Sequence, residues 1–198
     1  RDLKGVGVSN GPGSYTGLRI GASYAKGLCW TLGIPLVSVM TTELLAMTIF
    51  DMEDELDYPN ALLMPMIDAR RMEVYTAIYT GSYDDHYFGV VEPLTDIAAV
   101  VLTDKQSQAR LQEIVGDKLL YYFGNGAEKA KEIFDTILPG SHLIYDLHPR
   151  ADAMLSSVVK RISLGQTEDV AYWEPYYLKE YEAKKSVNKV LSRTLGKS

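Results

Sequence analysis

The segment Gly11–Gly21, with the sequence GPGSYTGLRIG, decides how the first part of this chain folds. It follows residues 5–9, where apolar side chains alternate as they do in a β-strand. Its glycines permit a positive φ, its proline fixes its own φ, and Ser14 or Thr16 is a suitable helix N-cap. We therefore predict a tight corner from a strand into a helix that continues to about Leu32.

Such a corner leaves backbone amides unpaired at the positive end of a helix, where a phosphate can bind. The spacing fits neither standard fingerprint, because Gly17 has no lysine directly after it and arrives one position late for a dinucleotide-binding loop. A second glycine turn, GNG at 124–126, also follows an apolar strand. The candidate contacts with a phosphate or nucleotide are Gly13, Ser14, Thr16 and Gly124. A purely structural role for both turns is the alternative.

The helix after the corner carries small residues at a spacing of four, so one of its faces is nearly bare of side chains. Glycine inside a helix costs about 1 kcal/mol relative to alanine, so Gly21 and Gly27 need a compensating gain, such as the close approach of another backbone. The spacing leaves open whether this face lies on the chain's own sheet or against a partner helix. The candidate partner interface consists of Leu18, Gly21, Ala22, Ala25 and Cys29.

Composition indicates a globular protein of one or two domains, since 46% of its 198 residues are hydrophobic. We expect no membrane partner, because no apolar run approaches the length of a membrane span. The only cysteine, Cys29, cannot form a disulfide within the chain. Together with the lack of a signal-peptide pattern, this favours a cytoplasmic location.

The charge of the chain is divided unevenly. The net charge of −6 disfavours a broad nucleic-acid surface. Residues 179–198, however, contain six Lys or Arg and two Glu, a net charge of +4, which leaves −10 for residues 1–178. A basic tail of this kind can contact RNA phosphates or an acidic partner, and the alternative is a solvated terminus without a binding role.

The order of the predicted elements indicates an α/β protein with two lobes. A second strand at 36–39 completes a βαβ unit, which predicts a parallel pair, and Thr41 or Thr42 is expected to cap the following helix. The acidic run at 51–57 marks a domain boundary. Beyond it we predict a meander of three strands at 61–67, 72–80 and 86–91, and a later strand at 119–123. Three helical stretches are expected at 111–115, 127–138 and 151–164.

Groupings that could perform catalysis are sparse. His86, His142 and His148 are far apart and lack a spacing typical of metal ligands, so we predict neither a metal site nor catalytic residues. The segment 68–73, DARRME, follows an apolar strand, where its aspartate and paired arginines belong either to a binding site or to a turn.

Seven sequence blocks, in the same order, resemble those of the TsaB (YeaZ) family, and they extend over nearly the whole chain. They are GPGSYTGLRIG at 11–21, AKGL at 25–28, IP at 34–35, VS at 37–38, DARRMEVY at 68–75, GNGA at 124–127 and EPYYLK at 174–179. Lys179 stands where the family more often has arginine, a planar fork rather than a point charge.

The resemblance implies an actin-like, RNase H-like (ASKHA) fold of two lobes. Family members begin with a few dozen further residues, so the first lobe is expected to lack its N-terminal strands. The expected division is 1–57 for the rest of the first lobe, 58–178 for the second lobe and 179–198 for the basic tail.

The resemblance also implies a function. Members of this family are non-catalytic scaffolds needed to form N6-threonylcarbamoyladenosine in tRNA; they pair with the catalytic paralogue TsaD, recruit the ATPase TsaE, and meet tRNA through that complex. It further implies a homodimer when TsaD is absent and ATP or ADP at the interface with TsaD. TsaD carries a His-x-x-x-His metal motif that this sequence lacks. The alternative is an actin-like ATPase or kinase that uses the glycine turns.

Overall fold

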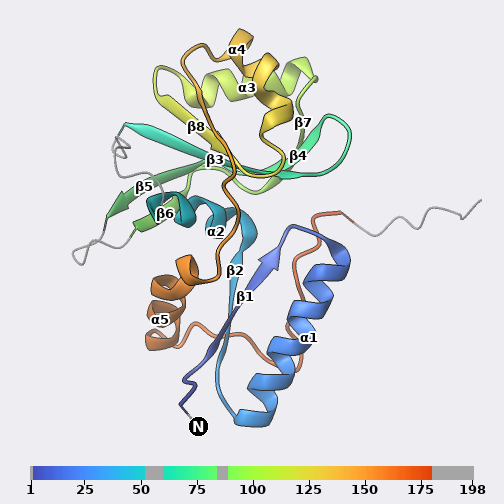
Figure 1. Cartoon of the computed structure of the whole chain (residues 1–198), viewed down its shortest axis with the longest axis vertical. Helices are drawn as coiled ribbons and strands as arrows, with labels where there is room; N and C mark the ends of the chain where they lie inside the picture. Colours follow the sequence, from blue (N-terminus) through green and yellow to red (C-terminus); the bar gives the residue numbers. More distant parts are fainter. Residues whose placement is uncertain (1, 52–59, 84–88, 180–198) are drawn as a thin grey trace, which may run out of the picture.

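The computed structural model describes residues 2–51, 60–83 and 89–179 (Figure 1). The predicted corner is confirmed: strand β1 (Val6–Gly11) leads into helix α1 (Tyr15–Leu32), and the Ser14 Oγ accepts a hydrogen bond from the Gly17 amide at 3.3 Å. Strand β2 (Leu36–Met40) then pairs with β1 in parallel, as the βαβ pattern predicts.

These two strands lie between two helices (Figure 1). The side chain of Leu36 packs on the α1 side, in a core with Ala22, Ala25, Cys29 and Trp173. Val37 and Val39 face the other way, where they pack with helix α5 (Leu155–Ser163) and the one-turn helix η3 (Asp152–Met154). The first lobe is therefore a parallel strand pair covered on both faces.

Residues 166–177, which we call the strap, run from β2 across α1 to the end of β1. The Glu168 amide donates to the Leu36 carbonyl at 2.8 Å, and the Glu168 carboxylate accepts from the Ser38 hydroxyl at 2.5 Å. The Lys26 ammonium donates to the carbonyls of Ala171 and Trp173 at 3.2 and 2.8 Å. Several contacts between segments far apart in sequence thus hold the strap on the first lobe.

The second sheet is built on β3 (Ala61–Asp68), which is buried from end to end except at Asp68. One of its edges pairs with β8 (Leu119–Phe123), which pairs in turn with β9 (His142–Ile144), all in parallel. The other edge pairs with β4 (Glu73–Thr76) and β5 (Tyr79–Tyr83), both antiparallel. These continue outward to β7 (Ala98–Val101) and β6 (Gly89–Pro93), respectively.

The single strand predicted at 72–80 is interrupted. Strands β4 and β5 share one register against β3. Met66 lies opposite Thr76 on β4. Four residues earlier on β3, Leu62 lies opposite Thr80 on β5, which is four residues later than Thr76. Between them, the Ile78 amide donates to the Thr95 hydroxyl at 2.9 Å and the Ile78 carbonyl accepts from Leu94 and Thr95 amides. The predicted meander is therefore confirmed in outline, with a break made by a loop that the local pattern does not reveal.

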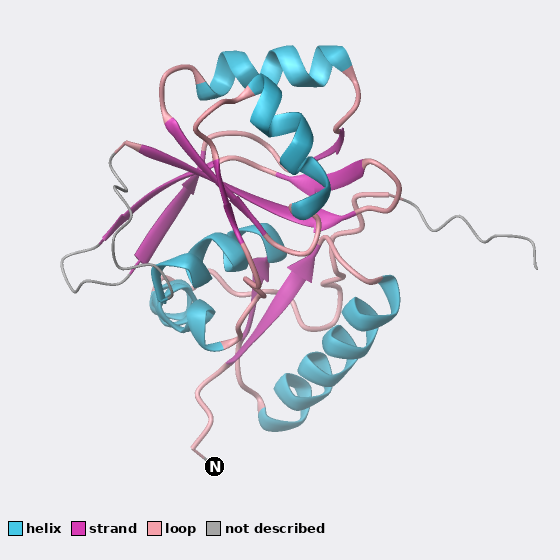
Figure 2. Ribbon diagram, turned by 45° about the horizontal axis from the view of Figure 1, so that its top comes forward, coloured by secondary structure: helices cyan, strands magenta, loops and turns pink. Residues whose placement is uncertain are grey.

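Helices cover both faces of this sheet (Figure 2). On one face, α3 (Lys105–Val115), η2 (Glu128–Ala130) and α4 (Lys131–Ile137) pack on the inner side chains of β3 and β8. On the other face lie α2 (Thr41–Thr48) and η1 (Ile49–Asp51). The predicted cap of α2 is wrong: Met40 is its N-cap, while the hydroxyls of Thr41 and Thr42 bond to Ser9 and Tyr79.

The α/β class predicted from the sequence is confirmed, with one sheet in each part. The boundary predicted between residues 57 and 58 and the tail beyond Lys179 lie outside the described residues. Within the described part, no helix is both long enough and apolar enough to span a bilayer.

The substitution Phe134→Ala tests how much the face of β8 contributes to stability. The Phe134 ring is 1% exposed and lies edge-on to Tyr122, with ring centroids 4.9 Å apart. Its removal should cost about 3–5 kcal/mol of unfolding free energy, because such a cavity closes only in part. Urea unfolding of Leu164→Ala, a side chain that is 60% exposed, provides the control and should change by less than about 0.5 kcal/mol.

Candidate functional site

The first glycine corner is packed by the chain itself. Gly11 has a φ of +105°, and a Cβ there would lie 2.6 Å from the Tyr176 carbonyl oxygen and 3.1 Å from Leu18. Only glycine fits, because the strap crosses directly over it. The Ser14 hydroxyl is already engaged as the helix cap, whereas Gly13 and Thr16 are exposed.

The second glycine corner follows β8 and supports the β3–β4 hairpin. Gly124 has a φ of +100°, and a Cβ there would lie 2.6 Å from the Met66 carbonyl oxygen. The Gly126 amide donates to that same carbonyl at 2.9 Å, and the Asn125 side-chain oxygen accepts from the Asp68 amide at 2.9 Å. This turn therefore holds the end of β3 in place.

The sequence left open whether the segment 68–73 belongs to a binding site or to a turn. In the structure it forms the tight end of a hairpin, and Lys129 holds it together. The Lys129 ammonium donates to the Asp68 carboxylate and to the backbone carbonyls of Arg71 and Glu73. Its hydrogen bond is the main reason that the pKa of Asp68 is lowered, with a further contribution from the Arg70 amide. The Glu73 carboxylate pairs with the Lys179 ammonium at 2.5 Å. Nothing in the local sequence pointed to Lys129.

The strap connects the two corners. At one end the Tyr176 amide donates to the Asn10 carbonyl at 2.8 Å, and the Tyr177 ring packs on Tyr15 with centroids 5.3 Å apart. Two residues past this end of the strap, Lys179 reaches the hairpin through Glu73. The candidate phosphate contacts are thus divided between the two corners that the strap connects. The first corner holds Gly13, Ser14 and Thr16, and the second holds Gly124. Their contact with a phosphate or nucleotide stays a prediction.

Helix α1 has an inner and an outer face, and the candidate interface residues lie on the inner one. Ala22, Ala25 and Cys29 are 5%, 3% and 2% exposed, and Leu18 and Gly21 are half-buried. The chain's own strands and strap cover these residues. The small-residue spacing left open whether this face packs on the chain's own sheet or on a partner helix, and here it packs on the chain's own sheet. The burial also raises the pKa of the Cys29 thiol. The exposed apolar residues Ile20, Tyr24 and Trp30 lie on the opposite face of α1.

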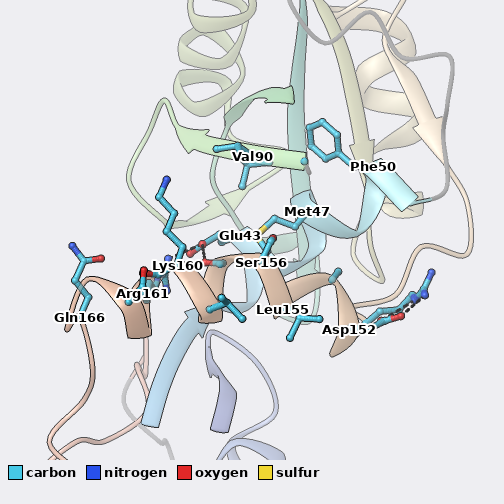
Figure 3. Close-up of a pocket in the computed structure, with 17 residues that line it drawn as sticks. Glu43, Met47, Phe50, Val90, Asp152, Leu155, Ser156, Lys160, Arg161 and Gln166 are labelled. Carbon is cyan, nitrogen blue, oxygen red and sulfur yellow. Dashed lines mark hydrogen bonds and ion pairs between the residues drawn. The ribbon is translucent and has the colours of Figure 1, made fainter. Parts of the chain in front are cut away.

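A cleft of about 930 Å³ lies between α2, β6 and α5 (Figure 3). Apolar side chains, among them Met47 and Val90, line much of it. On its wall the Arg161 guanidinium pairs with the Glu43 carboxylate at 2.7 Å. None of the residues singled out from the sequence lines this cleft.

The two histidines in the described ranges lie in different surroundings. His142 lies on β9, where its ring stacks on Tyr121 with centroids 5.3 Å apart, and His148 is exposed. His86 lies outside the described residues. In the described ranges, no three His, Cys, Asp or Glu side chains are grouped so that they could hold a metal ion.

The two-lobed α/β arrangement fits the actin-like, RNase H-like class that the sequence resemblance implies. A family model described as "TsaD: tRNA N6-adenosine threonylcarbamoyltransferase" matches residues 1–170. A solved structure from Pseudomonas aeruginosa, an uncharacterized protein "with similarity to peptidase YEAZ", shares the fold: it superposes with a TM-score of 0.66 at 20% identity, over 89% of this chain and 74% of that one. The fold that the resemblance implied is thereby confirmed.

Curated relatives narrow the class. The Bacillus subtilis "tRNA threonylcarbamoyladenosine biosynthesis protein TsaB" is 32% identical over 140 residues, which are 70% of this chain and 53% of the relative. The Escherichia coli protein of the same name is 27% identical over 188 residues, 94% of this chain and 75% of the relative. This chain therefore belongs to the TsaB (YeaZ) family. It spans about half the length of the Bacillus relative.

The substitution Lys129→Met tests the hairpin's electrostatics. Without the ammonium, the pKa of Asp68 should rise toward the ordinary value of about 3.9. Because the pairing lowers the folded-state pKa, it stabilises the wild type above the unfolded-state pKa, and this contribution is lost as the pH falls through the folded-state pKa. NMR titration of the Asp68 carboxyl carbon measures the change. Lys131→Met, which breaks an exposed pair with Asp135, should leave the pKa of Asp68 where it is.

Proposed function

We propose that this chain acts in the biosynthesis of threonylcarbamoyladenosine in tRNA, as a non-catalytic subunit that binds TsaD. The observation that carries the proposal is the match to proteins named for this pathway, the longest of which extends over 94% of the chain. In this proposal the chain positions TsaD, TsaE joins the pair, and tRNA binds to the assembled complex. ATP or ADP would bind at the interface with TsaD.

The outer face of α1 is the proposed contact with TsaD. Ile20, Tyr24 and Trp30 are 66%, 70% and 74% exposed, and Gly27 lies among them on the helix surface. A Cβ at Gly27 would meet nothing within 4 Å, so no contact inside the described part of the chain requires glycine there. Glycine inside a helix costs about 1 kcal/mol relative to alanine. A partner helix packed closely over Gly27, with the larger residues around it, would offset that cost.

The proposed function is tested by reconstitution with the cognate TsaD, TsaE, ATP and unmodified tRNA, omitting one protein at a time. Formation of threonylcarbamoyladenosine should disappear when this chain is left out. Full modification in its absence would contradict the proposal. ATP turnover by the chain alone would favour the alternative of an actin-like ATPase or kinase.

The proposed contact is tested separately by Ile20→Asp. The side chain is 66% exposed, so the fold should persist, while a buried carboxylate at the interface should lower the amount of TsaD that copurifies by about tenfold or more. Leu164→Asp places the same charge at another exposed apolar position and should copurify normally. Wild-type recovery of TsaD with Ile20→Asp would exclude this face of α1.

A further inference from the structure

The end of the β3–β4 hairpin has an unusual backbone. Arg70 and Arg71 have φ values of +69° and +47°, so two consecutive residues other than glycine are left-handed. This conformation is unfavourable for residues that carry a Cβ and is usually taken by Gly, Asn or Asp. The surroundings hold it in place: the Arg70 amide donates to Asp68 at 2.8 Å, and its carbonyl accepts from the Glu73 amide at 3.1 Å.

The acidic groups of this hairpin are already neutralised by other cations. Lys129 pairs with the Asp68 carboxylate, and Lys179 pairs with the Glu73 carboxylate. Asp68 also feels the positive charge of Arg70, which helps to lower its pKa. Both arginines are exposed, and within the described part of the chain neither guanidinium has a hydrogen bond or salt bridge. The hairpin thus fixes its backbone with its carboxylates and directs two cationic forks outward.

Charge is concentrated around this turn. Its four cations, Arg70, Arg71, Lys129 and Lys179, face two carboxylates, so the cluster has a net charge of +2 in a chain whose net charge is −6. The sequence that continues from Lys179 contains five further Lys or Arg and two Glu. Two residues before Lys179, Tyr177 packs on Tyr15, and the Arg19 guanidinium lies 4.9 Å from the centre of the Tyr15 ring. The chain therefore leads, within two residues of Lys179, to a pair of aromatic rings and a further arginine.

We propose that the Arg70–Arg71 turn binds the phosphate backbone of an RNA. Guanidinium groups match phosphate oxygens through two parallel hydrogen bonds, and basic surfaces with neighbouring aromatic rings are typical of single-stranded RNA contacts. The continued run of basic residues favours a repeating polyanion over a short acidic segment of a protein. The inference depends on the proposed function only in the choice of tRNA as the RNA to test.

The test compares binding of a fluorescent, unmodified tRNA transcript by the wild type and by R70Q/R71Q, using anisotropy over a series of KCl concentrations. The variant should bind about tenfold more weakly, and the dependence of log Kd on log salt should become shallower by about 0.7–0.9 for each phosphate that the variant no longer neutralises. R110Q/K118Q removes the same charge from exposed positions on and after α3 and should retain both the affinity and the slope. R70K/R71K keeps the charge but not the forks, so it should keep the slope with reduced affinity.

Three results would overturn the proposal. The first is wild-type affinity and slope in R70Q/R71Q, and the second is an equal weakening in R110Q/K118Q, which would indicate only overall charge. The third is unchanged tRNA binding together with loss of copurifying TsaD or TsaE, which would make the turn a protein-binding surface. The anisotropy measurement requires no modification activity, so the tRNA affinities can be interpreted even if the reconstitution fails. Conversely, wild-type tRNA binding by R70Q/R71Q would contradict only the role of the turn and not the proposed scaffold function.

Discussion

The two-sided burial of α2 is the constraint on which the rest of the structure depends. Leu44 and Met47 belong to the core beneath α5, whereas Leu45 and Ala46 belong to the core beneath the second sheet. A short helix that buries apolar side chains on two sides is stable only when it is enclosed, so both sheets have to close on it. The Thr42 hydroxyl adds a buried hydrogen bond of 2.8 Å to the Tyr79 hydroxyl, and burial raises the pKa of that tyrosine to about 12. This hydrogen bond ties α2 to strand β5 of the second sheet.

With the sheets fixed in this way, one short segment can reach both glycine corners. The strap bonds to Asn10 beside the first corner, and Lys179 bonds to Glu73 on the hairpin that the second corner supports. Gly11 and Gly124 are required for the same reason, since a backbone carbonyl lies where each Cβ would be. The glycine turns are explained by close backbone packing before any ligand is considered. The two exposed arginines, Arg70 and Arg71, project from the hairpin that the second corner supports.

The sequence predicted those parts of the fold that depend on local patterns. The corner, α1, β2, β3 and β8 follow from turn residues and from runs or alternations of apolar side chains. The parts it missed depend on contacts between distant segments. The break at Ile78 is made by Thr95, the threonines expected to cap α2 bond to Ser9 and Tyr79 instead, and the short strands β7 and β9 carry too few residues to show a period. Lys129 was missed because its partners lie more than fifty residues away.

Helix α1 shows why the choice of a face is harder than the recognition of a helix. Small residues at a spacing of four suit the chain's own sheet as well as a partner, and here Ala22, Ala25 and Cys29 serve the chain's own sheet. The glycines separate the two roles. At Gly21 the nearest atom to an added Cβ is 3.9 Å away on Val8, an ordinary contact, and at Gly27 none lies within 4 Å. Neither position is therefore kept as glycine by the packing described here, although each costs about 1 kcal/mol relative to alanine. A helix that is already satisfied on its inner face, yet retains Gly27 among exposed apolar side chains, is best explained by a second backbone packing on its outer face.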